Sequence, residues 1–293
     1  METDQIDRPR EFKKLLLASF ISQSGSHFMT LAIAFTVYAL SGGSMVKAAL
    51  VMVFSYLPVI FLTKLAGSLI DRKLSVRMLL VFEASAAIVS VICGALVYFD
   101  QFIVLLPLLC ARCLLTFATR AALSRWIKLI SSLGKQGVRL KIFLLGFFLA
   151  TTVAGILAIL TLGIDLRPAI VNVVIIDVVT YLISMLVILS LKSLPETPVE
   201  IQKVEISGSQ EAFSDTLGQI LQQPVLKKTF LRVVLSQALF QGAYLALIAV
   251  IADHFDLGLK AGAFFQISAS IGLIIAFVVL WIFPLCMREK KDA

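Results

Sequence analysis

The sequence contains few of the residues on which enzymes and metal sites depend. Charged side chains make up only 15% of its 293 residues, whereas soluble domains carry about 25%. Its two His, His27 and His254, and its four Cys are scattered along the chain and cannot be assembled into a zinc site. No paired carboxylates, Ser–His pair or G-x-x-x-x-G-K-[ST] run stands out. We therefore expect no enzyme activity and no bound metal, nucleotide or other cofactor.

Apolar residues dominate instead. They account for 59% of the chain, and the mean hydropathy is +0.98, which excludes a soluble globule, a disordered chain and a disulfide scaffold. A bilayer core about 30 Å thick needs ~20 mostly apolar residues per helix, and the runs are too long and too uniform for the alternating strands of a barrel. The sequence thus predicts an all-α membrane protein with about eight transmembrane helices, at residues 15–40, 46–69, 78–98, 102–124, 141–163, 169–191, 229–252 and 261–284.

The positive charges are sorted along this topology. Twenty of the 26 Lys and Arg residues fall in the N-terminus, the C-terminal tail and the loops after the second, fourth and sixth spans. Only Lys47, Arg167 and Lys260 fall in the segments on the other side of the membrane. By the positive-inside rule the first side is the cytoplasm. We therefore expect a multi-pass protein of the cell inner (plasma) membrane with both termini cytoplasmic, whose basic segments are topology signals rather than a nucleic-acid surface.

The chain divides into three parts. Residues 1–191 hold six spans, residues 192–228 form a polar cytoplasmic linker, and residues 229–293 hold two further spans. Within the linker, apolar residues at helical spacing predict a short amphipathic helix, either on the membrane surface or packed under the six-helix unit; they are Phe213, Leu217, Ile220 and Leu221. Six helices, a linker and then further helices is the layout of a secondary transporter built from two repeated halves.

Three charged residues lie well inside the predicted spans: Glu83, Arg112 and Asp177. An ionised group at the bilayer centre costs at least about 2.5–3.5 kcal/mol, so each needs a partner, water or neutralisation. Counted from the outer ends of their spans, Arg112 is roughly 15 Å deep and Asp177 roughly 12 Å deep, and we expect these two to pair. Glu83 is closer in depth to Arg120, which gives a second expected pair. Such a network either gates a transport cavity or holds the bundle together as static salt bridges.

The loop after the second span carries a recognisable pattern, Gly67-Ser-Leu69-Ile-Asp71-Arg72, followed by Arg77. Gly67 allows close helix approach, and Asp71 can cap the following turn. Arg72 and Arg77 can bind carboxylates or lipid phosphates. The segment resembles the G-x-L-x-D-R signature of the major facilitator superfamily. The resemblance implies a major-facilitator-type helical bundle in which this loop gates the cytoplasmic side.

Three more stretches are similar to the drug-export, macrolide-efflux-like branch of that superfamily. They are residues 21–44 in the first span, Phe117-Ala-Thr-Arg120 at the end of the fourth, and residues 177–184 in the sixth. This resemblance implies secondary-active export of a small amphiphilic compound by alternating access, with the first and fourth spans lining a cavity at the membrane midplane. The expected cavity residues are Gln23, His27, Thr30 and Arg112.

The chain also departs from that branch. Ser26 stands where an acidic residue is common, and only Gly155 remains of the G-P-x-x-G-G motif of antiporters, so no coupling ion is assigned. The family norm is twelve spans, and four are missing at the C-terminal end. The alternative is therefore a truncated or degenerate membrane protein that transports nothing, or a half-transporter completed by a second chain or an oligomer. The expected partners are the lipid bilayer and a small-molecule substrate, with no nucleic acid.

Overall fold

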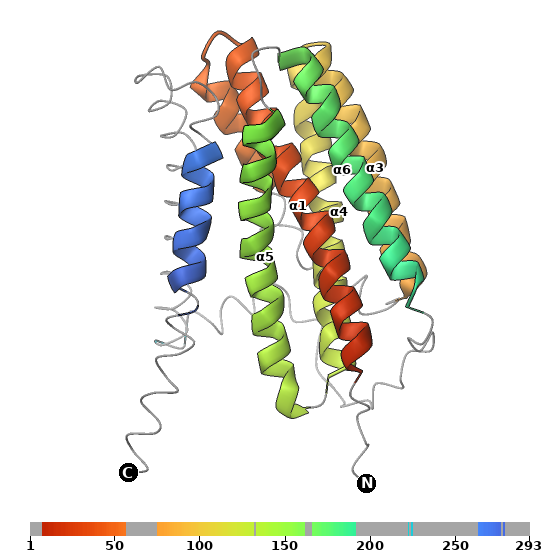
Figure 1. Ribbon diagram of the computed structural model, residues 1–293. Coiled ribbons are helices and arrows are strands. Elements are labelled where there is room, and N and C mark those ends of the chain that lie inside the picture. The colour runs from red at the N-terminus through yellow and green to blue at the C-terminus, as the bar shows by residue number, and fades with distance from the viewer. Residues whose placement is uncertain are drawn as a thin grey trace.

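The computed structural model describes residues 8–56, 75–131, 133–161, 166–191 and 263–276, together with positions 222, 224 and 278. Every regular element in these segments is a helix, and none of them contains a strand. The described segments contain five long helices and two short apolar ones, whose arrangement is drawn in Figure 1. The long helices are α1 (Pro9–Leu40), α3 (Val76–Tyr98), α4 (Phe102–Leu129), α5 (Leu133–Thr161) and α6 (Leu166–Leu189), and the short ones are Met45–Tyr56 and Ala263–Ala276.

Four of these helices, α3, α4, α5 and α6, are long and apolar enough to cross a membrane. Their outer surfaces carry large apolar side chains in the open: Ile103 is 83% exposed, Leu160 74% and Leu186 66%. In water such a surface would aggregate, whereas in lipid it is the expected exterior. The chain is thus an all-helical membrane-embedded protein. The predicted linker 192–228 apart from positions 222 and 224, the predicted span 229–252 and much of the span 46–69 lie outside the described residues.

Two helices begin earlier than their apolar runs. α1 starts at Pro9 rather than at residue 15, because a proline at the first helical position is pre-organised and loses no hydrogen bond. α5 starts at Leu133 rather than at residue 141, so that Lys135 and Arg139 lie on its first turns. Hydropathy marks the part of a helix that lies in lipid, and it is silent about turns that continue into the polar region.

α1 is the central helix of the bundle. It packs chiefly against α6 and α5 and also touches α3 and α4, while α3 packs between α6 and α4 (Figure 1). α3 and α4 are joined by a tight turn in which Asp100 has φ +56°, a left-handed conformation that Asp tolerates better than most residues. Because this connection is short, α3 and α4 run in opposite directions.

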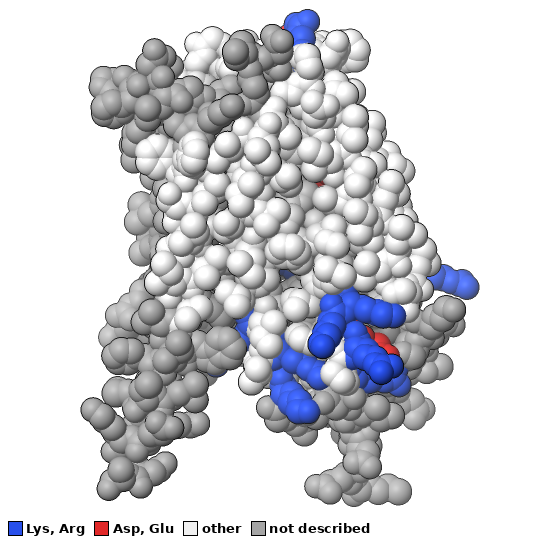
Figure 2. Space-filling view, in the orientation of Figure 1, with Lys and Arg blue, Asp and Glu red and all other residues white. Residues whose placement is uncertain are grey.

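The two ends of the bundle differ in charge. Two contacts identify the end at which α1 begins: the Arg8 amide donates to the carbonyl of Ile130 (3.2 Å), and Lys14 Nζ donates to the carbonyl of Ser190 (2.9 Å). We call this the basic end; blue side chains gather on it in Figure 2. The described cations that belong to it are Arg8, Arg10, Lys13, Lys14, Arg77, Arg125, Lys135, Arg139 and Lys141.

The opposite end of the bundle carries few cations among the described residues. Lys47 lies 5.7 Å from the ring centre of Phe102, and Arg167 pairs with Asp100 at 3.4 Å. The described helices therefore place the basic residues together at one end, as the sequence count led us to expect. Which end faces the cytoplasm stays a prediction.

Two apolar clusters lie at different heights along α1. Nearer the basic end, Leu15 and Ala18 pack with Leu123 and Ile127 of α4. Beyond residue 27, the buried segment 28–37 packs with apolar side chains of α3, α4 and α6. The stretch of α1 between these clusters is polar, and it contributes most to the site described next.

Candidate functional site

One face of α1 is polar in the middle of an otherwise apolar bundle. Its members recur every three or four residues, which places them on one side of a helix; they are Ser19, Ser22, Gln23, Ser26, His27 and Thr30. All six are buried or partly buried. This stripe makes α1 less apolar than the four helices that qualify as spans, and its side chains contact α3, α4, α5 and α6.

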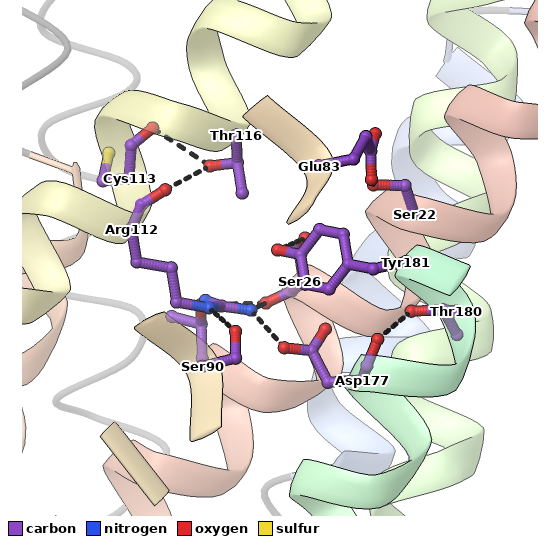
Figure 3. Close-up of polar contacts among 11 residues, drawn as sticks. Ser22, Ser26, Glu83, Ser90, Arg112, Cys113, Thr116, Asp177, Thr180 and Tyr181 are labelled. Carbon is purple, nitrogen blue, oxygen red and sulfur yellow. Dashed lines mark hydrogen bonds and ion pairs between the residues drawn. The ribbon is translucent and has the colours of Figure 1, made fainter. Parts of the chain in front are cut away.

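Arg112 of α4 is the centre of the polar contacts (Figure 3). Its side chain is buried and donates four hydrogen bonds: Nε to the Ser90 hydroxyl (2.8 Å), one terminal nitrogen to the Thr30 hydroxyl (3.0 Å), and the other to the Ser26 carbonyl and to the Asp177 carboxylate (3.1 Å each). These partners come from α3, α1 and α6. The expected ion pair between Arg112 and Asp177 is present, and the same guanidinium ties four helices together.

The α1–α6 contact beside this ion pair depends on a glycine. A Cβ on Gly25 would lie 1.9 Å from Thr180 Oγ1 and 2.8 Å from Asp177 Oδ1, so a larger residue has no space there. The close approach also lets the Tyr181 and Ser26 hydroxyls meet at 2.9 Å. Small residues at helix interfaces allow this kind of backbone approach in membranes.

The second expected ion pair, between Glu83 and Arg120, is wrong. Glu83 is fully buried on α3 and accepts a hydrogen bond from the Ser22 hydroxyl (3.0 Å), while its other oxygen has no hydrogen-bond partner among the described residues. The Arg120 guanidinium instead lies 4.3 Å from the ring centre of Phe147 on α5. The two residues share a depth but face different neighbours, because depth along a helix says nothing about the direction in which a side chain points.

Arg120 differs from the buried arginines Arg112 and Arg139. Arg112 has the bonds described above, and Arg139 donates to the Ile130 carbonyl and the Ser131 hydroxyl (3.1 Å each). Within the described segments, Arg120 makes no hydrogen bond or ion pair, and its Nε is completely buried. Phe147 also contacts His27 edge to face, at 4.9 Å between ring centres. The Arg120 guanidinium, the Phe147 ring and the His27 imidazole therefore lie in a row, with the phenyl ring between the other two groups.

The polar stripe of α1, residues of α4, Glu83 of α3 and the last turn of the short helix Met45–Tyr56 line a cavity of about 70 Å³. This volume suits about two waters, each of which occupies about 30 Å³ in the liquid. The four residues expected to line a cavity all lie on its wall: Gln23, His27, Thr30 and Arg112. Further lining residues that bear on the argument are Ser22, Ser55, Tyr56, Glu83, Thr116 and Arg120.

Several wall atoms of this cavity have no hydrogen-bond partner among the residues that the structure describes. They are Gln23 Oε1, His27 Nε2, Ser55 Oγ, Glu83 Oε1 and Arg120 Nε. Buried polar atoms are nearly always paired, because an unmade hydrogen bond costs about 1–3 kcal/mol. The cavity is thus equipped to bind a polar group. Among the described residues, no three His, Cys, Asp or Glu side chains come together as metal ligands would.

The expected gating loop is only partly described. Gly67, Asp71 and Arg72 lie outside the described residues. Arg77 is exposed in the first turn of α3 at the basic end. That turn is capped by Ser75, whose hydroxyl accepts from the Met78 amide at 3.1 Å.

The hydroxyl groups of the site were not predicted from the sequence. Ser22, Ser26, Ser90 and Tyr181 each bond to a charged residue or to another hydroxyl of the site. A usable signal existed for Ser22 and Ser26, since they share the helical face of Gln23 and Thr30. For Ser90 and Tyr181 no such signal existed, because hydroxyls are also common at ordinary helix contacts in membranes.

No protein-family model matches the chain, and no curated protein or solved structure matches it either. The resemblance to the major facilitator superfamily therefore rests on the sequence patterns alone.

Proposed function

We propose that this protein is a secondary-active transporter that moves a small amphiphilic compound across the membrane by alternating access. One observation carries the proposal: a polar cavity with unpaired hydrogen-bonding atoms lies at mid-depth in a bundle whose exterior is apolar. Polar groups in a membrane interior are costly and mark substrate pathways more often than not. Apolar clusters pack against α1 on either side of its polar stretch.

The fold and placement that go with this function are proposals of the same kind. The bundle is of the major facilitator type, from its drug-export branch, and export is the direction that this resemblance favours. The basic end faces the cytoplasm of a cell whose inner (plasma) membrane holds the protein, in line with the positive-inside rule. The segment from Gly67 to Arg77 gates that side.

The cavity must enlarge during transport. Its volume of about 70 Å³ is well below the roughly 300–1,000 Å³ of pockets that hold drug-sized ligands. Rocking of helix bundles against each other is the motion by which such transporters open a midplane site. Arg112 links α1, α3, α4 and α6, so we assign it the role of holding this unit rigid while it moves.

A second candidate is a membrane protein that transports nothing, or a half-transporter that needs a second chain. The small volume of the cavity and the saturated contacts of Arg112 favour it, because both also describe a static, well-packed helix interface. Transport measurements separate the two candidates.

The test is flux into liposomes that contain the purified full chain. Three probes of different charge serve as candidate substrates: neutral N-phenyl-1-naphthylamine, anionic 8-anilinonaphthalene-1-sulfonate and cationic ethidium. Saturable movement of at least one probe, above that of protein-free liposomes, supports the transporter. A folded, monodisperse protein that moves none of them, alone or after co-reconstitution at high protein density, supports the second candidate.

A matched pair of variants ties the flux to the cavity. Gln23→Leu removes a polar group from the cavity wall, and Gln101→Leu makes the same change in the exposed turn between α3 and α4. We expect Gln23→Leu to lower the flux and Gln101→Leu to leave it unchanged. Equal flux in both variants would mean that the cavity is not on the transport path.

A further inference from the structure

Arg120, in the wall of the cavity, is a cation that pairs with none of the carboxylates described by the structure. Within the described segments it makes neither an ion pair nor a hydrogen bond, and its closest described interaction is with the Phe147 ring at 4.3 Å. An arginine keeps its charge in every accessible environment, and in a low-dielectric interior an isolated charge is strongly unfavourable. A cation–π contact contributes about 2 kcal/mol when desolvated, which is less than the penalty of several kcal/mol for a buried ion.

Other unpaired donors lie on the same wall. The Ser55 hydroxyl and His27 Nε2 have no partner among the described residues. A hydroxyl donates one proton, and an imidazole nitrogen donates when it carries the hydrogen. Together with Arg120 they form a set of donors that is satisfied by a group with several acceptor oxygens, such as a carboxylate, sulfonate or phosphate.

The acidic residue of the cavity does not fill this role. Glu83 is held by Ser22 at 3.0 Å and does not pair with Arg120. Asp177, the other buried carboxylate nearby, is already engaged by Arg112 at 3.1 Å. The positive charge of Arg120 is therefore left for something that enters the cavity.

We propose that the ligand of this cavity is an anionic amphiphile, whose acidic group is bound by Arg120 with Ser55 and His27 while its apolar body extends between the helices. This inference rests on the proposed function, since it names the substrate class of the same site. The volume of about 70 Å³ accommodates an acidic headgroup, and the aromatic side chains of Tyr56 and Phe117 in the wall suit the adjoining apolar part.

The experiment is equilibrium binding to the full chain in phosphatidylcholine nanodiscs, followed by fluorescence, with empty nanodiscs as the baseline. The probes are 8-anilinonaphthalene-1-sulfonate and N-phenyl-1-naphthylamine, which differ only in the sulfonate. We expect Arg120→Gln to weaken binding of the sulfonate about tenfold or more, as loss of a charge-assisted hydrogen bond does, and to change binding of the neutral probe less than about twofold. Arg10→Gln is the matched control, because it removes an exposed arginine at the basic end, and it should change neither probe.

Two further measurements keep the inference testable if Arg120→Gln does not fold. In the wild-type protein, naphthalene-1-sulfonate should displace the bound sulfonate probe, whereas neutral naphthalene-1-sulfonamide should not. Glu83→Gln should leave the affinity for the sulfonate unchanged or raise it, because it removes an acidic group from the same cavity. Equal displacement by both competitors, or equal effects of Arg120→Gln and Arg10→Gln on the sulfonate, would overturn the anion site.

The source of the anion is decided by adding phosphatidylglycerol to the nanodiscs. Competition that depends on Arg120 identifies a lipid headgroup as an occupant, and its absence identifies a diffusible anion; both support the site.

Failure of this inference is separable from failure of the transporter. Saturable flux of the neutral probe without sulfonate binding overturns only the anion site, and Arg120-dependent binding without flux of any probe overturns only transport.

Discussion

Replacing Arg112 with leucine should destabilise the protein more than replacing its partner Asp177 with asparagine. Both side chains of the pair are buried, at 5% and 0% exposure. Without Arg112, Asp177 loses the one described group that neutralises it, and its second oxygen already has no partner among the described residues. Breaking a buried pair in this way costs about 3–5 kcal/mol. Asp177→Asn also leaves a buried charge, on Arg112, but it should cost less, about 1–3 kcal/mol. The guanidinium keeps its bonds to the Ser90 and Thr30 hydroxyls and the Ser26 carbonyl, and the new amide oxygen can still accept from it.

The stability of the double variant Arg112→Leu/Asp177→Asn tests whether Asp177 is left as an unpaired charge. Once Arg112 is leucine, changing Asp177 to asparagine removes the stranded charge, so the double variant should be about 1–2 kcal/mol more stable than Arg112→Leu alone. The assay is reversible unfolding in mixed micelles with increasing SDS, read by tryptophan fluorescence. Arg167 and Asp100 provide a matched control pair, because they lie 3.4 Å apart but are 58% and 55% exposed. An exposed pair contributes about 0–1 kcal/mol, so this control cycle should be close to additive.

Two results would contradict a stranded charge on Asp177. One is a double variant as unstable as Arg112→Leu, which would mean that Asp177 is not stranded when the guanidinium is removed. The other is a cycle that is additive within about 0.5 kcal/mol, which would make the buried contact no stronger than the exposed one.

The other predictions concern packing, charge and topology. Gly25→Ala should lower the free energy of unfolding by about 1–3 kcal/mol in the same assay, because the new Cβ overlaps α6. Gly137→Ala, whose Cβ meets nothing within 4 Å, should instead stabilise α5 by about 0.5–1 kcal/mol. Equal effects of the two variants would contradict the close packing of α1 and α6. Glu83→Gln should change stability by less than about 1 kcal/mol, because no described cation pairs with Glu83, and a loss of about 3 kcal/mol or more would reveal an ion pair. With the four native cysteines replaced, an impermeant maleimide should label Gln101→Cys in intact cells and Arg10→Cys only after permeabilisation, and labelling of both from one side would contradict the topology.

The class of the protein and the positions of its helices follow from local features of the chain. Hydropathy is summed over neighbouring residues, so runs near 20 residues predict α3, α4 and α6 to within a few positions. The distribution of Lys and Arg along the chain is also a local feature, and in the structure the described basic residues gather at one end of the bundle. The start of α5 was misplaced because helical turns outside the lipid carry no apolar signal.

The site was predicted only as far as depth determines contacts. Arg112 and Asp177 are at similar depth and do meet. Glu83 and Arg120 are also at similar depth, but they do not meet. Glu83 of α3 lies against Ser22, and Arg120 of α4 lies against Phe147. Packing across the bundle determines which faces of two helices meet. This information is not contained in a single sequence, which does not report contacts between distant residues.

Local features of the sequence are enough to show that the chain is helical, that it belongs in lipid, and which of its segments carry positive charge, since each of these depends on residues close together in the chain. Only the packing of the helices shows that Arg112 bonds to three other helices, whereas Arg120 faces a cavity and makes no hydrogen bond or ion pair within the described segments beyond its contact with the Phe147 ring. The physical reason is that the state of a buried charge depends on the partners that packing brings within about 4 Å, and those partners lie tens of residues away along the chain.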